Sequence, residues 1–208
     1  LFSDSTNAER KGYTLSEKVV GGTIDDIFRE TRDRIVVATF ASNIHRVQQI
    51  ADAAMKYNRK IALTGRSMIE NVKTARELGY LTIPEDVIID TRDISNLPND
   101  QVVLLTTGSQ GEPMAALTRM ARGDHYHINI KQDDTVVISA NAIPGNENFI
   151  GQTINKLYRR GADVIYEDVS GVHVSGHASQ EELKLMLNLV KPKYFVPVHG
   201  EYRHLYKH

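Results

Sequence analysis

Four histidines between residues 171 and 205 are the residues most suited to chemistry. They are His173, His177, His199 and His204, and two of them, His177 and His199, each end an apolar run beside a glycine. Imidazole nitrogens bind metal ions such as zinc and exchange protons near neutral pH. These histidines could therefore build a metal or acid–base site. The alternative is that both are ordinary surface loop histidines, and spacing alone favours it because two histidines do not complete a metal site.

The segment between the two histidines contains one helix and one strand. Ser179 and Glu182 form an S-x-x-E capping box, which predicts a helix over residues 180–190 that ends before Pro192. An apolar run at residues 194–200 predicts a strand that ends at His199. A helix followed by a strand can return the chain to its starting point, so the two imidazoles could converge on one cleft.

The middle of the chain alternates between strand and helix patterns. Runs rich in β-branched residues predict strands at 34–40, 60–65, 86–90, 101–108, 134–140 and 163–169. Helical spacing predicts helices at 43–58 with Ser42 as N-cap, at 67–78 with Ser67 as N-cap, at 114–122 and at 147–160. Buried strands separated by helices indicate an α/β fold with a parallel sheet in a three-layer α/β/α arrangement. Ligands of such sheets collect at the C-terminal ends of the strands.

Composition limits the classes of protein that remain. The chain has 208 residues, 41% hydrophobic residues, no cysteine and a formal net charge of −1. These values allow a real core and argue against a histone-like, non-specific nucleic-acid binder. The sequence has no apolar run long enough for a membrane span and no signal peptide, so we expect a cytoplasmic protein without a membrane partner. The chain opens at Leu1 and stops abruptly, and we expect it to be a piece of a longer polypeptide.

Five short strings, in this order, resemble the ribonuclease J family. They are "SDSTNAER", "TFASNIHRVQQI", "TTGSQGEP", "VSGHAS" and "VPVHGEYRHL", and together they extend over essentially the whole chain. The resemblance implies a β-CASP domain of the metallo-β-lactamase superfamily. It implies three parts: residues 1–16 as the end of a metallo-β-lactamase part, 17–170 as the β-CASP domain, and 171–208 as a return segment to the metallo-β-lactamase domain.

The resemblance also implies roles for three residues. His199 would be a zinc ligand, His177 would face the scissile phosphate as a general acid or hold its oxygens, and Asp4 would accept a hydrogen bond from His177. An Asx-turn is the alternative for Asp4. The family carries two zinc ions, but its main ligand string, H-x-H-x-D-H, does not occur in this chain. We therefore expect the chain alone to bind zinc poorly and to cleave nothing. The only H-x-H pair, His125 and His127, is expected to lie on the surface or on an edge strand.

A glycine-containing turn at residues 106–113 follows a predicted strand and opens a predicted helix. Gly108 and Gly111 would let backbone N–H groups converge on an anion, and Ser109 and Gln110 would add donors, although a G-x-x-G turn is usually only a turn. The resemblance implies that this loop, together with His173 and Ser175, frames a pocket for a nucleotide phosphate. That pocket would explain a preference for RNA with a 5′-monophosphate.

The resulting hypothesis is a zinc-dependent ribonuclease of RNA processing and decay. The complete enzyme would act on RNA as a 5′–3′ exonuclease and endonuclease, and as a homo-oligomer or with a paralogue. This chain would supply the β-CASP RNA clamp and part of the active site. Two other hypotheses are a non-catalytic RNA-binding or regulatory β-CASP module and a doubly wound domain that binds a small molecule.

Overall fold

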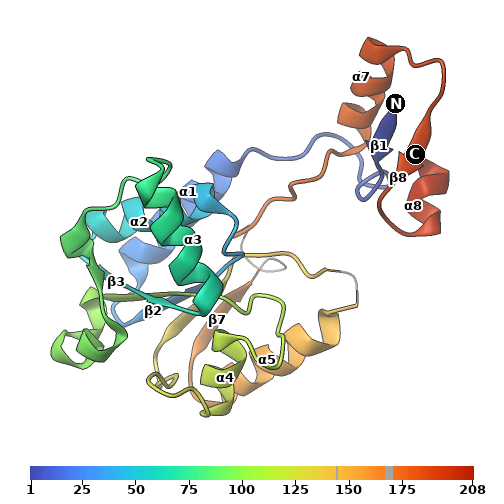
Figure 1. Cartoon of the computed structure of the whole chain (residues 1–208). Coiled ribbons are helices and arrows are strands. Elements are labelled where there is room, and N and C mark those ends of the chain that lie inside the picture. Colours follow the sequence, from blue (N-terminus) through green and yellow to red (C-terminus); the bar gives the residue numbers. More distant parts are fainter. Residues whose placement is uncertain (144, 167–170) are drawn as a thin grey trace. The chain divides into compact units, whose positions relative to one another are not determined.

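The structure is a computed structural model, and it describes residues 1–143, 145–166 and 171–208. The chain forms two compact units, which are shown in Figure 1. The terminal unit combines Leu1–Glu17 with Val174–His208, and the central unit comprises Lys18–His173. Both ends of the chain therefore belong to the same small unit, and the central unit is inserted between them.

The central unit is built on six parallel strands. The strands are β2 (Ile35–Ala38), β3 (Lys60–Thr64), β4 (Ile88–Ile89), β5 (Val102–Thr106), β6 (Thr135–Ile138) and β7 (Asp163–Tyr166). Their order across the sheet is β4-β3-β5-β2-β6-β7, and each neighbouring pair is parallel. The predicted α/β class with a parallel sheet is confirmed. The predicted strand at 163–169 is present as far as Tyr166, and residues 167–169 lie outside the described part.

Helices cover both faces of this sheet. They are α1 (Glu17–Glu30), α2 (Ile44–Lys56), α3 (Arg66–Glu77), α4 (Ala116–Arg122) and α5 (Glu147–Arg159). In Figure 1, α1, α2 and α3 lie on one side of the strands and α4 and α5 lie on the other. Successive strand residues point to opposite faces, so Val36, Leu104 and Val136 share one face, where they pack with Leu117 and Leu157. None of the described helices is long and apolar enough to cross a bilayer.

Several predicted boundaries were wrong for local reasons. The N-cap of α2 is Asn43, whose side-chain oxygen accepts the Arg46 N–H at 3.1 Å, and not Ser42. Helix α3 begins after Gly65, so Ser67 lies inside the helix and caps nothing. The strand predicted at 86–90 shrinks to β4, because Glu85–Val87 forms a 3-10 turn. Helix α1 was not predicted.

The strand order creates a switch point at the centre of the sheet. β2 and β5 are hydrogen-bonded neighbours, yet the helices that follow them, α2 and α4, lie on opposite faces (Figure 1). The loops that lead from β2 and β5 to these helices run toward opposite faces of the sheet. In α/β proteins such loops leave a crevice at the C-terminal ends of the strands, where ligands bind. The loop that begins at Thr107 after β5 borders this position in the central unit.

The terminal unit contains a two-stranded parallel sheet and two helices. Strand β1 (Phe2–Asp4) pairs with β8 (Val196–Val198), with Asp4 opposite Val198 in register. Helix α7 (Gln180–Val190) has the predicted bounds, and its predicted capping box is confirmed: the Glu182 carboxylate accepts the Ser179 N–H at 2.7 Å. Helix α8 (Tyr202–Lys207) follows β8. The parallel pairing places the C-terminal ends of β1 and β8 together.

Candidate metal centre

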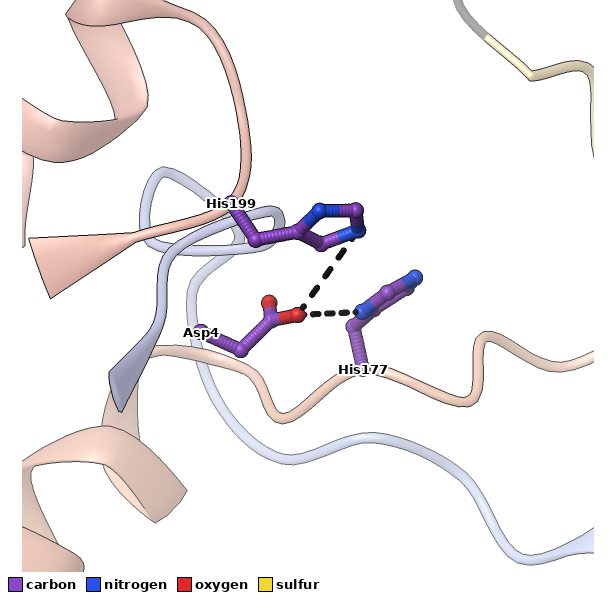
Figure 2. Close-up of side chains that lie close together, drawn as sticks. All are labelled: Asp4, His177 and His199. Carbon is purple, nitrogen blue, oxygen red and sulfur yellow. Dashed lines mark hydrogen bonds and ion pairs between the residues drawn. The ribbon is translucent and has the colours of Figure 1, made fainter. Parts of the chain in front are cut away.

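Asp4, His177 and His199 converge in the terminal unit. Asp4 ends β1, His199 directly follows β8, and the register of these strands sets the two residues side by side. His177 comes from the segment that leads into α7, and its ring approaches the same point (Figure 2). One ligand atom from each of the three side chains lies within 4.8 Å of the others. Within the described ranges, no other group of three or more His, Asp or Glu side chains meets that condition.

The Asp4 carboxylate faces both imidazoles. Asp4 Oδ2 lies 3.0 Å from His177 Nδ1 and 3.9 Å from His199 Nε2, as the dashed lines in Figure 2 show. Asp4 Oδ1 accepts the Thr6 N–H at 2.9 Å, the Asx-turn that the sequence offered as an alternative role. The turn and the imidazole contact occur together, because each uses a different carboxylate oxygen.

The charge on Asp4 determines the proton position on His177. Burial opposes ionisation of Asp4, but hydrogen bonds from Thr6 and the nearby His177 outweigh it, and the pKa of Asp4 is lowered from 3.8. An ionised carboxylate only accepts hydrogen bonds, so His177 Nδ1 is the donor in this contact. His177 Nε2 then lies at the outer end of the ring, pointing away from Asp4 (Figure 2).

The backbone at His199 adopts a conformation that few residues tolerate. His199 has a φ of 57° and the next residue, Gly200, has a φ of 129°. A non-glycine residue in the left-handed region is uncommon, and such strain is concentrated at functional sites. A Cβ at Gly200 would lie 3.0 Å from His204 Nδ1, so this turn requires a glycine beside the histidine. The His199 side chain is 66% exposed, which leaves its ring accessible to a ligand.

The donor set fits part of a zinc site. Zinc takes histidine nitrogens and aspartate oxygens, and catalytic sites commonly use three protein ligands. The hydrogen bond between Asp4 and His177 already uses Oδ2 and Nδ1, whereas His199 Nε2 has only the longer contact with the carboxylate. The cluster therefore offers His199 as a first ligand and a carboxylate–histidine pair beside it, the kind of pair that orients groups around a metal.

The loop after β5 is tightly packed in the central unit. Gly108 and Gly111 have φ values of 103° and 70°, and a Cβ at Gly111 would lie 2.5 Å from the backbone of Phe149 in α5. The Gln110 carboxamide holds the loop that follows β6: its Nε2 donates to the Asn141 carbonyl and its Oε1 accepts the Ile143 N–H, both at 2.7 Å. Gln110 is thus engaged in joining two loops at the C-terminal end of the sheet.

The other predicted phosphate-binding residues are divided between the units. Ser109 belongs to the central unit and is 3% exposed, and within the described residues its hydroxyl makes no hydrogen bond. His173 is the last residue of the central unit, whereas Ser175 belongs to the terminal unit. Ser175 Oγ accepts hydrogen bonds from Asn7 Nδ2 and from the His177 N–H, so its hydroxyl proton is available to a ligand.

The H-x-H pair forms a turn and not a strand. His125 Nδ1 accepts backbone N–H groups from His127 and Ile128, and its Nε2 lies 3.3 Å from Thr64 Oγ1. Burial, and then the nearby Arg119 and His127, lower the pKa of His125. Both ring nitrogens of His125 are engaged in these contacts, and His127 is exposed, as the expectation of a surface position has it.

Sequence reasoning missed the residues that surround the main chain of His177. Asn7 and Thr14 both donate hydrogen bonds to the His177 carbonyl oxygen, at 2.9 and 2.8 Å. The only signal was the density of short polar residues in "SDSTN", which indicates turns in general. Nothing in the sequence connected that string to one carbonyl group about 170 positions later.

Two family profiles match the chain. One, described as "Ribonuclease J, beta-CASP domain", matches residues 32–157. The other, described as "Zn-dependent metallo-hydrolase RNA specificity domain", matches residues 161–208. The parallel sheet, the histidine–carboxylate cluster and these profiles define a β-CASP protein of the metallo-hydrolase class.

The similar proteins agree on the family. The chain is 50% identical over 208 residues to Ribonuclease J of Helicobacter pylori (strain J99), covering 100% of this chain and 30% of that protein. It is 52% identical over 208 residues to Ribonuclease J of Synechocystis sp. (strain PCC 6803), covering 32% of it. It is 50% identical over 203 residues to Ribonuclease J2 of Bacillus subtilis (strain 168), covering 98% of this chain and 36% of that protein. The chain belongs to the ribonuclease J family and spans about a third of the length of these curated relatives.

Proposed function

We propose that this chain is part of a zinc-dependent ribonuclease that hydrolyses RNA phosphodiester bonds. The observation that carries the proposal is the convergence of Asp4, His177 and His199 within 4.8 Å. The central unit would contact RNA, and the terminal unit would contribute one side of the active site. The family supports this, since its matching profile is described as an RNA specificity domain of zinc-dependent metallo-hydrolases.

Each of the three residues has a separate task in this proposal. His199 Nε2 would hold the metal, and Asp4 would fix the tautomer and orientation of His177 through Nδ1. His177 Nε2 would then face the phosphate, where it could donate a proton to the leaving oxygen or hold a phosphate oxygen. Bound zinc supplies Lewis acidity toward the phosphate and activates water.

The remaining ligands would come from polypeptide outside this chain. A two-stranded sheet is at best marginally stable alone, and β1 and β8 expose apolar side chains: Phe2 is 75% exposed and Val196 is 42% exposed. These features support the proposal that the terminal unit is part of a larger metallo-β-lactamase domain. That domain would bring further metal ligands to the Asp4 edge, and the isolated chain would be inactive.

The substrate would be RNA of decay and processing pathways, digested from a 5′-monophosphate and also cleaved internally. Within the central unit, Ser109 and the backbone at Gly108 would bind the phosphate, with Gln110 holding this loop in place. His173 and Ser175 would be further phosphate-binding residues. The free Ser109 hydroxyl supports this role. Ser109→Ala should weaken 5′-monophosphate-dependent digestion more than internal cleavage, and an equal loss of both activities would argue against the pocket.

Single histidine variants test the main proposal in the longest natural polypeptide that carries these residues. We expect His199→Ala to lose zinc, measured by mass spectrometry of the purified protein, and to lose RNA cleavage. His177→Ala should retain most of the zinc and lose cleavage. His127→Ala is the control, because that exposed histidine lies outside the cluster, and it should change neither quantity. A His199→Ala protein with full zinc content and activity would refute the proposal.

A further inference from the structure

One sharp turn carries both the carboxylate that contacts His177 and a buried carboxamide. The Thr6 N–H donates to Asp4 Oδ1 at 2.9 Å and the Ala8 N–H donates to the Ser5 carbonyl at 3.0 Å, so residues 4–8 fold back on themselves. Asn7 lies within this turn and is only 4% exposed. A buried amide must satisfy its polar atoms inside the protein, so its partners show what it does.

The hydrogen-bond partners of the Asn7 side chain belong to the segment that carries His177. Asn7 Nδ2 donates to Ser175 Oγ at 2.8 Å and to the His177 carbonyl oxygen at 2.9 Å. The His177 N–H in turn donates to Ser175 Oγ at 3.2 Å. Both peptide groups that flank the His177 side chain are therefore tied, directly or through Ser175, to one nitrogen atom of Asn7.

Thr14 adds a second donor on the same carbonyl. Thr14 Oγ1 lies 2.8 Å from the His177 carbonyl oxygen and 2.9 Å from Ser179 Oγ, and the Thr14 N–H donates to Glu182 Oε2 at 3.0 Å. The His177 carbonyl thus receives two donors from the N-terminal segment. Its position is determined by residues that precede it by more than 160 positions.

We propose that Asn7 is a positioning residue for His177, and this inference rests on the proposed function of that histidine. Asp4 holds the ring at Nδ1, but a ring held at one atom can still pivot about that contact. Asn7 hydrogen-bonds to the main chain, so the turn at residues 4–8 holds His177 both at its ring, through Asp4, and at its carbonyl group, through Asn7. The two points together determine where Nε2 lies, and a displacement of about 1 Å is enough to lower the rate of a positioned group about a hundredfold.

Asn7→Asp is the sharpest perturbation, because it preserves the shape of the side chain and replaces its donor by an acceptor. The ionised carboxylate cannot donate a hydrogen bond to the His177 carbonyl oxygen or to Ser175 Oγ. Gln180→Glu is the matched control: Gln180 Nε2 donates to the Ala8 carbonyl at 3.4 Å, so it joins the same two segments without touching His177.

The assay is single-turnover cleavage of a 5′-monophosphorylated oligoribonucleotide by the longest natural polypeptide that carries these residues. Asn7→Asp should lower the single-turnover rate constant by about tenfold to a hundredfold, the usual range for residues that orient a catalytic group. The half-saturating RNA concentration should change less than the rate constant, because Asn7 is buried and reaches the proposed phosphate-binding residue Ser175 through a single hydrogen bond. Gln180→Glu should leave both quantities within about twofold.

A double-mutant cycle separates positioning from a general structural effect. In a His177→Ala background, Asn7→Asp should cause no further loss, because the group it positions is absent. If Asn7→Asp lowers the residual rate by the same factor in both backgrounds, Asn7 acts only on the fold and the inference is overturned. If Asn7→Asp does not fold, Thr14→Val decides the question by the same cycle, since it removes the other donor to the same carbonyl.

The cycle also distinguishes this inference from the proposed function. A fully active His177→Ala protein would refute the role of His177 itself. A His177→Ala protein that loses activity, combined with Asn7→Asp and Thr14→Val proteins that keep it, would leave the proposed function standing and overturn only the positioning role.

Discussion

The loop that carries Ser109 depends on glycine at position 111 for two separate physical reasons. The φ of Gly111 is 70°, in the left-handed region, and a Cβ there would lie 2.5 Å from the Phe149 carbonyl carbon and oxygen and 2.7 Å from the Ile150 nitrogen. These atoms belong to the backbone of α5, so they cannot move aside as a flexible side chain would. Gly111→Ala should therefore destabilise the protein strongly.

The expected size of this effect follows from the two contributions. A left-handed conformation costs a non-glycine residue about 1–2 kcal/mol. Forcing an extra carbon into a filled space costs about 1–3 kcal/mol more. Gly111→Ala should then lower the free energy of unfolding by about 2–5 kcal/mol, a large fraction of the stability of an ordinary domain.

Gly79→Ala isolates the first contribution. Gly79 follows the C-cap of α3 with a φ of 76°, close to that of Gly111, but a Cβ there would have no neighbour within 4 Å. Gly79→Ala should cost only about 1–2 kcal/mol. Urea unfolding of the two variants and the parent, followed by circular dichroism, measures the difference, which should be about 1–3 kcal/mol.

The comparison can refute the packing argument. If Gly111→Ala and Gly79→Ala lower the free energy of unfolding equally, the contact between the loop and α5 has no energetic weight. The loop after β5 would then not be held against the helix. The rigid placement of Ser109 at the end of the sheet would lose its physical basis.

Three further predictions concern charged and capping groups. The folded state lowers the pKa of Asp4 from 3.8, so the ionised carboxylate stabilises the fold above about pH 4. That stability is lost as the pH falls through the folded-state pKa. Asp4→Asn should therefore make the free energy of unfolding, measured in urea, fall less steeply with decreasing pH. Asp134→Asn should cost about 3–5 kcal/mol by removing one partner of the buried ion pair with Arg34, whereas replacing both by leucine should cost less in the same assay. Ser179→Ala should lower the free energy of unfolding by about 1 kcal/mol by removing the N-cap of α7, and an unchanged thermal midpoint would contradict the capping role.

The parts of the fold that could be predicted are those controlled by local patterns. β2, β5 and β6 are runs of β-branched or aliphatic residues, and all of their described side chains are buried. Helix α7 has an S-x-x-E box at its start, and its bounds were correct. Helix α1 was missed, because Gly21 and Gly22 in its centre lower its helical propensity and only burial of its apolar face compensates for them.

Local patterns also failed where two residues compete for one role. Ser42 and Asn43 are both good N-cap residues, and the backbone bend after β2 decided in favour of Asn43. The strand at β4 was overestimated because Asp86 and Val87 belong to a 3-10 turn that precedes it.

The sequence by itself determined which chemical groups are present: one acidic string, two glycine-flanked histidines and the alternation of strand and helix that defines the α/β class. The contact between Asp4 and His177 was implied by the family resemblance alone, since 173 positions separate the two residues and no local pattern encodes such a contact; the tertiary structure brings them together. The parallel pairing of β1 with β8 brought the carboxylate to the imidazoles. The same folding step placed Asn7 behind the main chain of His177, since a hydrogen bond depends on where atoms lie and not on their order in the chain.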